Sequence, residues 1–89
     1  MQFRWIDWNR DHIDEHGVDP EEAEMVVRNA RPPFPDQHGD DKLLVMGRDR
    51  GGRLLQVIYI FDPDDTIFII HARPLNDREK HRYRRRIRT

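Results

Sequence analysis

His71 and Arg73, near the end of the last apolar run, are the residues best suited to chemistry. The sequence contains no cysteine and no serine, which excludes a thiolate or serine nucleophile. Any reaction must therefore use histidine, arginine, tyrosine, lysine or carboxylates. An imidazole beside a guanidinium can transfer a proton and hold a phosphate. The alternative is that both residues only end a strand, with Arg73 paired to Asp62 or Glu79.

The strand that carries these two residues should present them on one side. Side chains alternate along a strand, which predicts a shared face for four residues: Ile67, Ile69, His71 and Arg73. A turn that pairs Asp62 with Ile67 would also place Gln56 opposite Arg73. In the preceding hairpin, a two-residue Gly51-Gly52 loop would set Gly47 opposite Gln56. A shift of that hairpin by one residue brings Arg48 onto this face instead.

A second group of residues, His12, Glu15 and His16, has the H-x-x-E-H spacing of a zinc-protease helix. Gly17 should end that helix at once, and the sequence signals no third ligand. His16 is therefore expected to cap the negative end of the helix. We predict no metal and no cofactor, and a small metallohydrolase that uses His12 and His16 remains an alternative.

Charge is distributed unevenly along the chain, although the formal net charge is only −1. Residues 1–41 carry 4 basic and 11 acidic side chains, whereas residues 78–89 carry 7 basic and 1 acidic. A basic end of this kind favours contact with phosphates, and its alternative is pairing with the acidic half of the chain. The absence of a long apolar run predicts no membrane span and a cytoplasmic location.

The elements predicted from the sequence form a single α+β domain, residues 1–89. Two N-terminal helices are expected, one from Asp7 to about His16 and one that begins at Pro20, after the N-cap Asp19, and ends before Pro32. Strands are expected at 42–49, 53–62 and 67–73, with a possible edge strand at 34–38, in a three- to four-stranded antiparallel sheet. A capping box, Asn76 with Glu79, starts a basic C-terminal helix over 77–88.

Several of these elements, in this order, resemble the BrnT-type toxins, which are small ribonucleases of type II toxin–antitoxin modules and distantly similar to RelE. The resemblance covers residues 3–83. It rests on aromatic residues near the start and on these motifs: His16-Gly17-Val18 before an acidic capped helix, Gly47-Arg48 on a strand, and Ala72-Arg73 followed by Glu79 and Tyr83.

The resemblance implies a BrnT/RelE-like fold, metal-independent cleavage of an RNA substrate, and a cognate BrnA-like antitoxin. It carries catalytic roles to Arg73 and Tyr83. From the residues themselves we add His71 as a further candidate for proton transfer. The candidates for binding the RNA backbone are four basic residues: Arg48, Lys80, Arg84 and Arg85. Glu15 and His71 depart from the family pattern, so a degenerate, non-catalytic nucleic-acid- or protein-binding module of the same fold remains an alternative.

Overall fold

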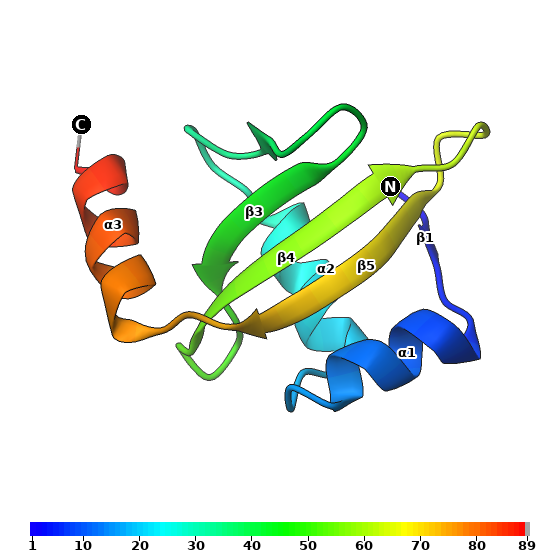
Figure 1. Ribbon diagram of the computed structural model, residues 1–89, viewed down its shortest axis with the longest axis horizontal. Helices are drawn as coiled ribbons and strands as arrows, with labels where there is room; N and C mark the ends of the chain where they lie inside the picture. Colours follow the sequence, from blue (N-terminus) through cyan, green and yellow to red (C-terminus); the bar gives the residue numbers. More distant parts are fainter. Residues whose placement is uncertain (89) are drawn as a thin grey trace.

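The structure is a computed structural model that describes residues 1–88 (Figure 1). Five strands form one mixed sheet in the order β1-β5-β4-β3-β2. The elements in chain order are β1 (Phe3–Arg4), α1 (Asp7–Asp14), α2 (Pro20–Arg28), β2 (Asp36–Gln37), β3 (Leu43–Arg48), β4 (Leu54–Phe61), β5 (Ile67–Pro74) and α3 (Asp77–Ile87). The α+β class is as predicted. The sheet has five strands and is mixed, whereas three or four antiparallel strands were expected.

The additional strand is β1, which pairs with β5 in parallel. Phe3 lies opposite Ile67 and Arg4 opposite Phe68. The Arg4 guanidinium also binds Asp62 through two hydrogen bonds of 2.8 and 3.0 Å. A strand of two residues gives no periodic signal in the sequence, and its partner β5 is far along the chain, so this strand is not among the predicted elements.

Helix α1 is shorter than predicted because its end is a turn. It stops at Asp14, and Gly17 adopts a left-handed conformation with φ of 71° in the turn that follows. His16 therefore lies beyond the helix. At the other end the side-chain oxygen of Asn9 accepts a hydrogen bond from the backbone N–H of Ile6 at 2.8 Å, which satisfies one of the free donors of the first turn.

The starts of the other two helices follow the sequence signals. Helix α2 has Pro20 in its first turn, and Glu22 accepts a hydrogen bond from the Asp19 N–H at 2.9 Å. Helix α3 has the complete capping box, with Asn76 and Glu79 each accepting from the other's backbone N–H at 2.9 Å.

A β-bulge in β5 changes which residues share a face. Ile69 lies opposite Tyr59 and His71 opposite Ile58, so Ile70 is the extra residue between them. The prediction that Ile67 and Ile69 share a face with His71 is wrong, because strict alternation is interrupted here. The face that packs beneath the helices instead holds three almost fully buried residues, at 0–2% exposure: Ile67, Ile69 and Ala72.

The hairpin of β3 and β4 adopts the shifted register. Arg48 lies opposite Leu54 and Met46 opposite Gln56, and Gln56 lies opposite Arg73 as predicted. Arg48 is therefore on the same sheet face as Arg73. The expected pairing of Asp62 with Ile67 at the turn is wrong, because Phe61 lies opposite Ile67. After the bulge, His71 and Arg73 have the partners that the predicted register gives them, Ile58 and Gln56.

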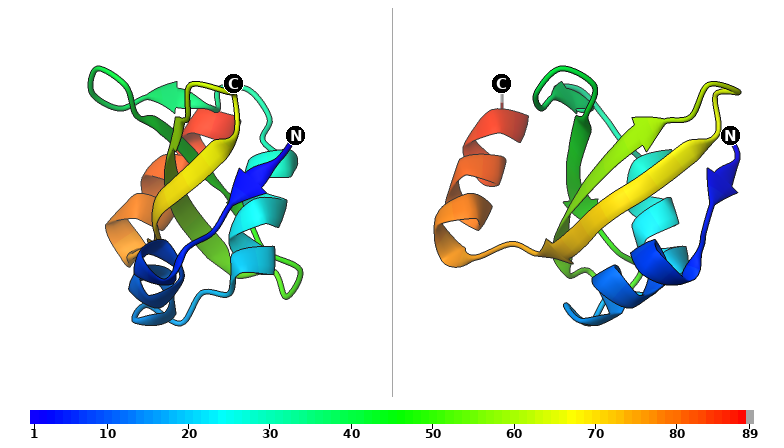
Figure 2. Two further views of the ribbon diagram at one scale, coloured as in Figure 1. Left: turned by 90° about the vertical axis from the view of Figure 1, so that its right-hand side faces the viewer. Right: turned by 45° about the vertical axis from the view of Figure 1, so that its right-hand side comes forward.

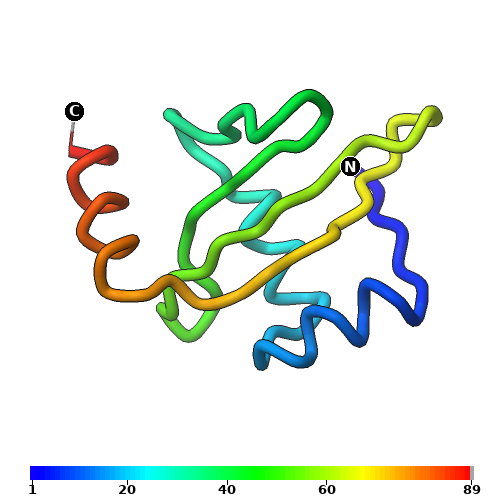
Figure 3. The backbone as a smooth tube through the Cα atoms, in the orientation of Figure 1, coloured from blue at the N-terminus to red at the C-terminus, as the bar shows by residue number. Residues whose placement is uncertain are grey.

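Helix α2 covers one face of the sheet, α1 lies along its β5 edge, and α3 stands beyond its end (Figures 1 and 2). Helix α1 contacts β5, and α2 contacts β3 and β4. The core lies between the sheet and these two helices and includes Ile13, Val26, Val45, Leu55 and Val57. Strand β1 and helix α3 lie toward opposite ends of the long axis (Figure 3). Among residues 1–88 no helix has both the length and the apolar content that crossing a bilayer requires.

Candidate functional site

Arg73, predicted to clamp a phosphate, is already paired within the domain. Its guanidinium binds both carboxylate oxygens of Glu79, at 2.7 and 2.6 Å, and also donates to the Pro74 carbonyl. Its side chain is 29% exposed and that of Glu79 is 12% exposed. The alternative in which Arg73 pairs with Glu79 is therefore the one that the structure contains. Its charge is neutralised before any ligand binds.

This ion pair should make stability depend on pH in a defined window. The Arg73 guanidinium lowers the pKa of Glu79 from 4.5 to about 2. A carboxyl whose pKa is lower in the folded state than in the unfolded state stabilises the fold. This stabilisation is complete at pH values above the unfolded-state pKa and is lost as the pH falls through the folded-state pKa. We expect Glu79→Gln to cost about 1 to 2 kcal/mol at pH 6, a value reduced for solvent screening, and roughly half as much at pH 3, between the unfolded and the folded pKa.

Urea denaturation of both proteins between pH 6 and pH 3 measures this difference. Glu21→Gln is the matched control, because Glu21 is exposed at the first turn of α2. A cost of Glu79→Gln that is the same at both pH values would contradict the prediction.

Tyr83, the second residue implied by the resemblance, packs against the loop before β2. Its ring stacks on Phe34 with centroids 6.1 Å apart and an interplanar angle of 20°. It also lines a hollow of about 560 Å³ together with Arg48 and Met46. The lining of this hollow does not include His71 or Arg73. The structure therefore brings Tyr83 together with Arg48 and not with the other two catalytic candidates.

Three of the four predicted RNA-binding residues line one surface hollow of about 300 Å³, which we call the cationic groove. It is formed where the β3–β4 hairpin and the end of β5 meet α3, and its lining includes Arg48, Arg53, Lys80 and Arg84. Within residues 1–88, Lys80 and Arg84 have no carboxylate oxygen within 4.0 Å. The fourth candidate, Arg85, lines a different hollow, between Arg82, Arg86 and Arg88.

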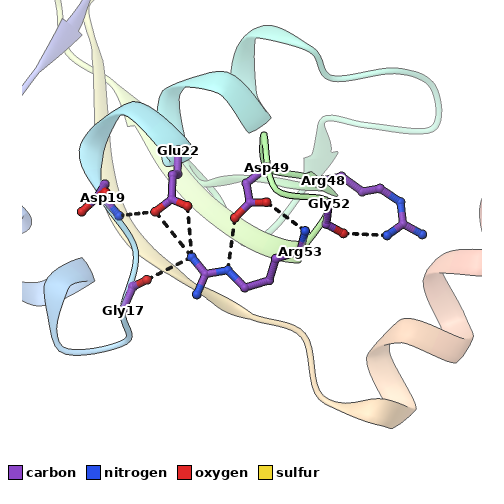
Figure 4. Close-up of polar contacts among 7 residues, drawn as sticks. All are labelled: Gly17, Asp19, Glu22, Arg48, Asp49, Gly52 and Arg53. Carbon is purple, nitrogen blue, oxygen red and sulfur yellow. Dashed lines mark hydrogen bonds and ion pairs between the residues drawn. The ribbon is translucent and has the colours of Figure 1, made fainter.

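Figure 4 distinguishes the two arginines of the hairpin. Arg53 binds Asp49 at 3.1 Å, Glu22 at 3.4 Å and the Gly17 carbonyl at 3.0 Å, so it joins the hairpin to the start of α2. Arg48 points the other way and donates to the Gly52 carbonyl at 2.8 Å, which fixes the side chain without neutralising it. Arg48 is the arginine of this pair whose charge faces outward.

His71 does not face the groove but meets the two histidines of the H-x-x-E-H motif. Its ring centroid lies 5.7 Å from that of His12 and 5.4 Å from that of His16, and the latter two are 6.0 Å apart. The expectation that the pair lacks a third ligand is wrong, because His71 supplies a third imidazole. Burial lowers the pKa of His71, and the nearby His16 and Arg73 charges act in the same direction.

The sequence gives no signal for this cluster, because its histidines lie in two distant segments. His12 and His16 share one motif, whereas His71 lies on the strand that carries Arg73. The third histidine is brought to the other two only by the packing of α1 on β5.

Comparisons with known proteins identify no relative: no family model, no curated protein and no solved structure matches the chain.

Proposed function

We propose that this protein binds RNA in the cationic groove and cleaves it as a ribonuclease toxin of the BrnT type. The observation that carries the proposal is that Arg48, Lys80 and Arg84, chosen from the sequence as RNA-binding residues, line one hollow. They come from different elements, β3 and α3, so only the fold unites them. Arg53 in the same hollow is paired with Asp49 and Glu22, but Arg48, Lys80 and Arg84 have no carboxylate oxygen within 4.0 Å among residues 1–88, which suits a phosphate backbone.

The reaction proposed is attack of the ribose 2′-hydroxyl on the adjacent phosphate. It needs a proton acceptor, a proton donor and a cation that faces the charge developing on the phosphate. Arg48 and Tyr83 line one hollow and are the residues best placed for the cation and for a proton transfer. Arg73, held by Glu79, acts in this proposal as a positioning residue for the start of α3. His71, the sequence candidate for the second proton transfer, lines neither hollow and is not assigned to this step.

Binding is tested with a labelled single-stranded RNA in excess chelator, measured by fluorescence anisotropy. We expect the triple variant Arg48→Ala, Lys80→Ala, Arg84→Ala to bind about 100-fold more weakly at 0.1 M salt. Three lost phosphate contacts, each with a slope of about 0.7, remove roughly two decades of affinity there. The slope of log K against log salt should fall by about 2.

The matched control removes three arginines outside the groove: Arg10→Ala, Arg28→Ala and Arg50→Ala. It makes the same change in net charge, so it separates a local site from general attraction between charges. An equal loss of affinity in both triple variants would contradict binding in the cationic groove.

A non-catalytic RNA-binding module is the second candidate, and the Arg73–Glu79 pair favours it because it removes the expected phosphate clamp. Gel analysis of the same RNA in chelator decides between the two. Cleavage that is lost in Tyr83→Phe while binding is kept supports the ribonuclease. Binding without cleavage by the unmodified protein supports the module.

The proposal also includes the cognate BrnA-like antitoxin that the resemblance implies. The cationic groove and the arginine-rich surface of α3 together offer a site for an acidic segment. If the antitoxin covers the groove, it should compete with RNA for binding in the same anisotropy assay.

A further inference from the structure

Three imidazoles converge where the end of α1 meets β5. His12 comes from the last turn of α1, His16 from the turn that follows, and His71 from the residue after the β-bulge. One ring nitrogen of each residue can be chosen so that all three lie within 4.8 Å of one another. We propose that His12, His16 and His71 bind a divalent transition-metal ion of the zinc class.

The spacing of the three nitrogens is close to what such an ion requires. Tetrahedral zinc with Zn–N bonds of about 2.0 to 2.1 Å separates its ligand nitrogens by about 3.4 Å. Closing the cluster therefore needs shifts of roughly 1 Å. His16 can provide this movement, since its side chain is exposed and lies in a turn rather than within the helix.

The ligand types select the class of metal. All three ligands are neutral nitrogens when deprotonated, which suits zinc, copper, nickel and cobalt, whereas magnesium and calcium prefer oxygen. Three protein ligands leave one tetrahedral position for water or a substrate atom, as in catalytic zinc sites. Because His16 is exposed, that position is accessible from solvent.

Neighbouring side chains hold the cluster in place. Trp8 stacks on His12 with ring centroids 5.5 Å apart and an interplanar angle of 2°, and also on Phe68 with centroids 6.2 Å apart. The Arg4 guanidinium lies 4.1 Å from the Phe68 ring centroid and is itself bound to Asp62. This row of stacked groups orients the His12 ring, as outer residues of metal sites do.

The charge next to the cluster on β5 belongs to an ion pair and not to a free guanidinium. Arg73, two residues from His71, acts against a positive charge there, and Glu79, bound to Arg73 at 2.6 Å, offsets part of this effect.

The test is calorimetric titration of Zn²⁺ into untagged protein stripped of metal. We expect one ion per chain. Each of His12→Gln, His16→Gln and His71→Gln should weaken binding by more than about 100-fold, because loss of outer residues alone costs 10- to 100-fold. The matched controls are His38→Gln and His81→Gln, whose side chains are exposed elsewhere, and they should bind as the unmodified protein does.

A second readout does not depend on affinity. In the Trp5→Phe background Trp8 is the remaining tryptophan, and its contact with His12 means that Co²⁺ should quench its fluorescence. The bound Co²⁺ should also give the visible absorption of a tetrahedral site. Circular dichroism of each variant establishes that it is folded.

Absence of saturable binding overturns the proposal. Binding that survives His71→Gln also overturns it, because the site would then be an i, i+4 pair without its third ligand. The RNA experiments above are carried out in chelator, so failure of the metal proposal and failure of the ribonuclease proposal are separate results.

Discussion

Replacing Asn9 with leucine should lower the free energy of unfolding by about 2 to 4 kcal/mol. Asn9 is fully buried, and its amide nitrogen donates to the Ile69 carbonyl at 2.9 Å and to the Arg4 carbonyl at 3.2 Å. Its oxygen accepts from the Ile6 N–H. Leucine has the same branched skeleton but leaves these three backbone groups without their partner, at about 1 to 3 kcal/mol for each group that stays buried.

Urea denaturation at neutral pH measures the loss. Asn29→Leu is the control, because Asn29 is exposed at the end of α2 and a surface change of this kind is usually worth less than about 0.5 kcal/mol. A loss below 1 kcal/mol for Asn9→Leu would mean that other groups or water replace the amide.

Truncation of Ile13 to alanine should cost about 3 to 4 kcal/mol. Ile13 is fully buried, lies one turn after Asn9 on α1, and belongs to the main core cluster. Removing three carbon atoms from a packed site loses transfer free energy and leaves a cavity, and such changes cost about 2 to 5 kcal/mol. The better helix propensity of alanine recovers less than about 0.7 kcal/mol.

Ile87→Ala is the matched control, since Ile87 is 49% exposed on α3 and should lose less than about 1 kcal/mol. Equal losses for the two isoleucines in thermal or urea unfolding would contradict the assignment of Ile13 to the core. Asn9 and Ile13 together fix α1 on β5, so both variants should also disturb the three-histidine cluster.

Local signals in the sequence predicted the elements well. The Asp19-Pro20 start of α2 and the Asn76–Glu79 capping box are found where they were expected, because each depends on residues within one helical turn. The pairing of β1 with β5 could not be predicted, since it joins segments more than sixty residues apart. The bulge at Ile70 could not be predicted either, because residues 67–70 are all apolar and so do not show which side chains face the core.

The candidate site was predicted in part for the same reasons. Arg48, Lys80 and Arg84 were chosen by charge, and the fold brings them to one groove. For Arg73 the sequence leaves two alternatives, a phosphate clamp or a pair with Asp62 or Glu79, and the structure contains the pair with Glu79. That glutamate caps α3 and binds the guanidinium at the same time. The two roles could be seen separately in the sequence, but their combination in one carboxylate required the structure.

The extra residue in β5 is not what brings the three histidines together. Without Ile70, Ile69 would still lie opposite Tyr59 and His71 opposite Ile58, now as neighbours in a regular ladder. Phe68 would also stay opposite Ile60, so the groups that Trp8 and His12 contact would keep their cross-strand neighbours. A one-residue gap at this position in an aligned sequence is therefore compatible with the cluster wherever all three histidines are present.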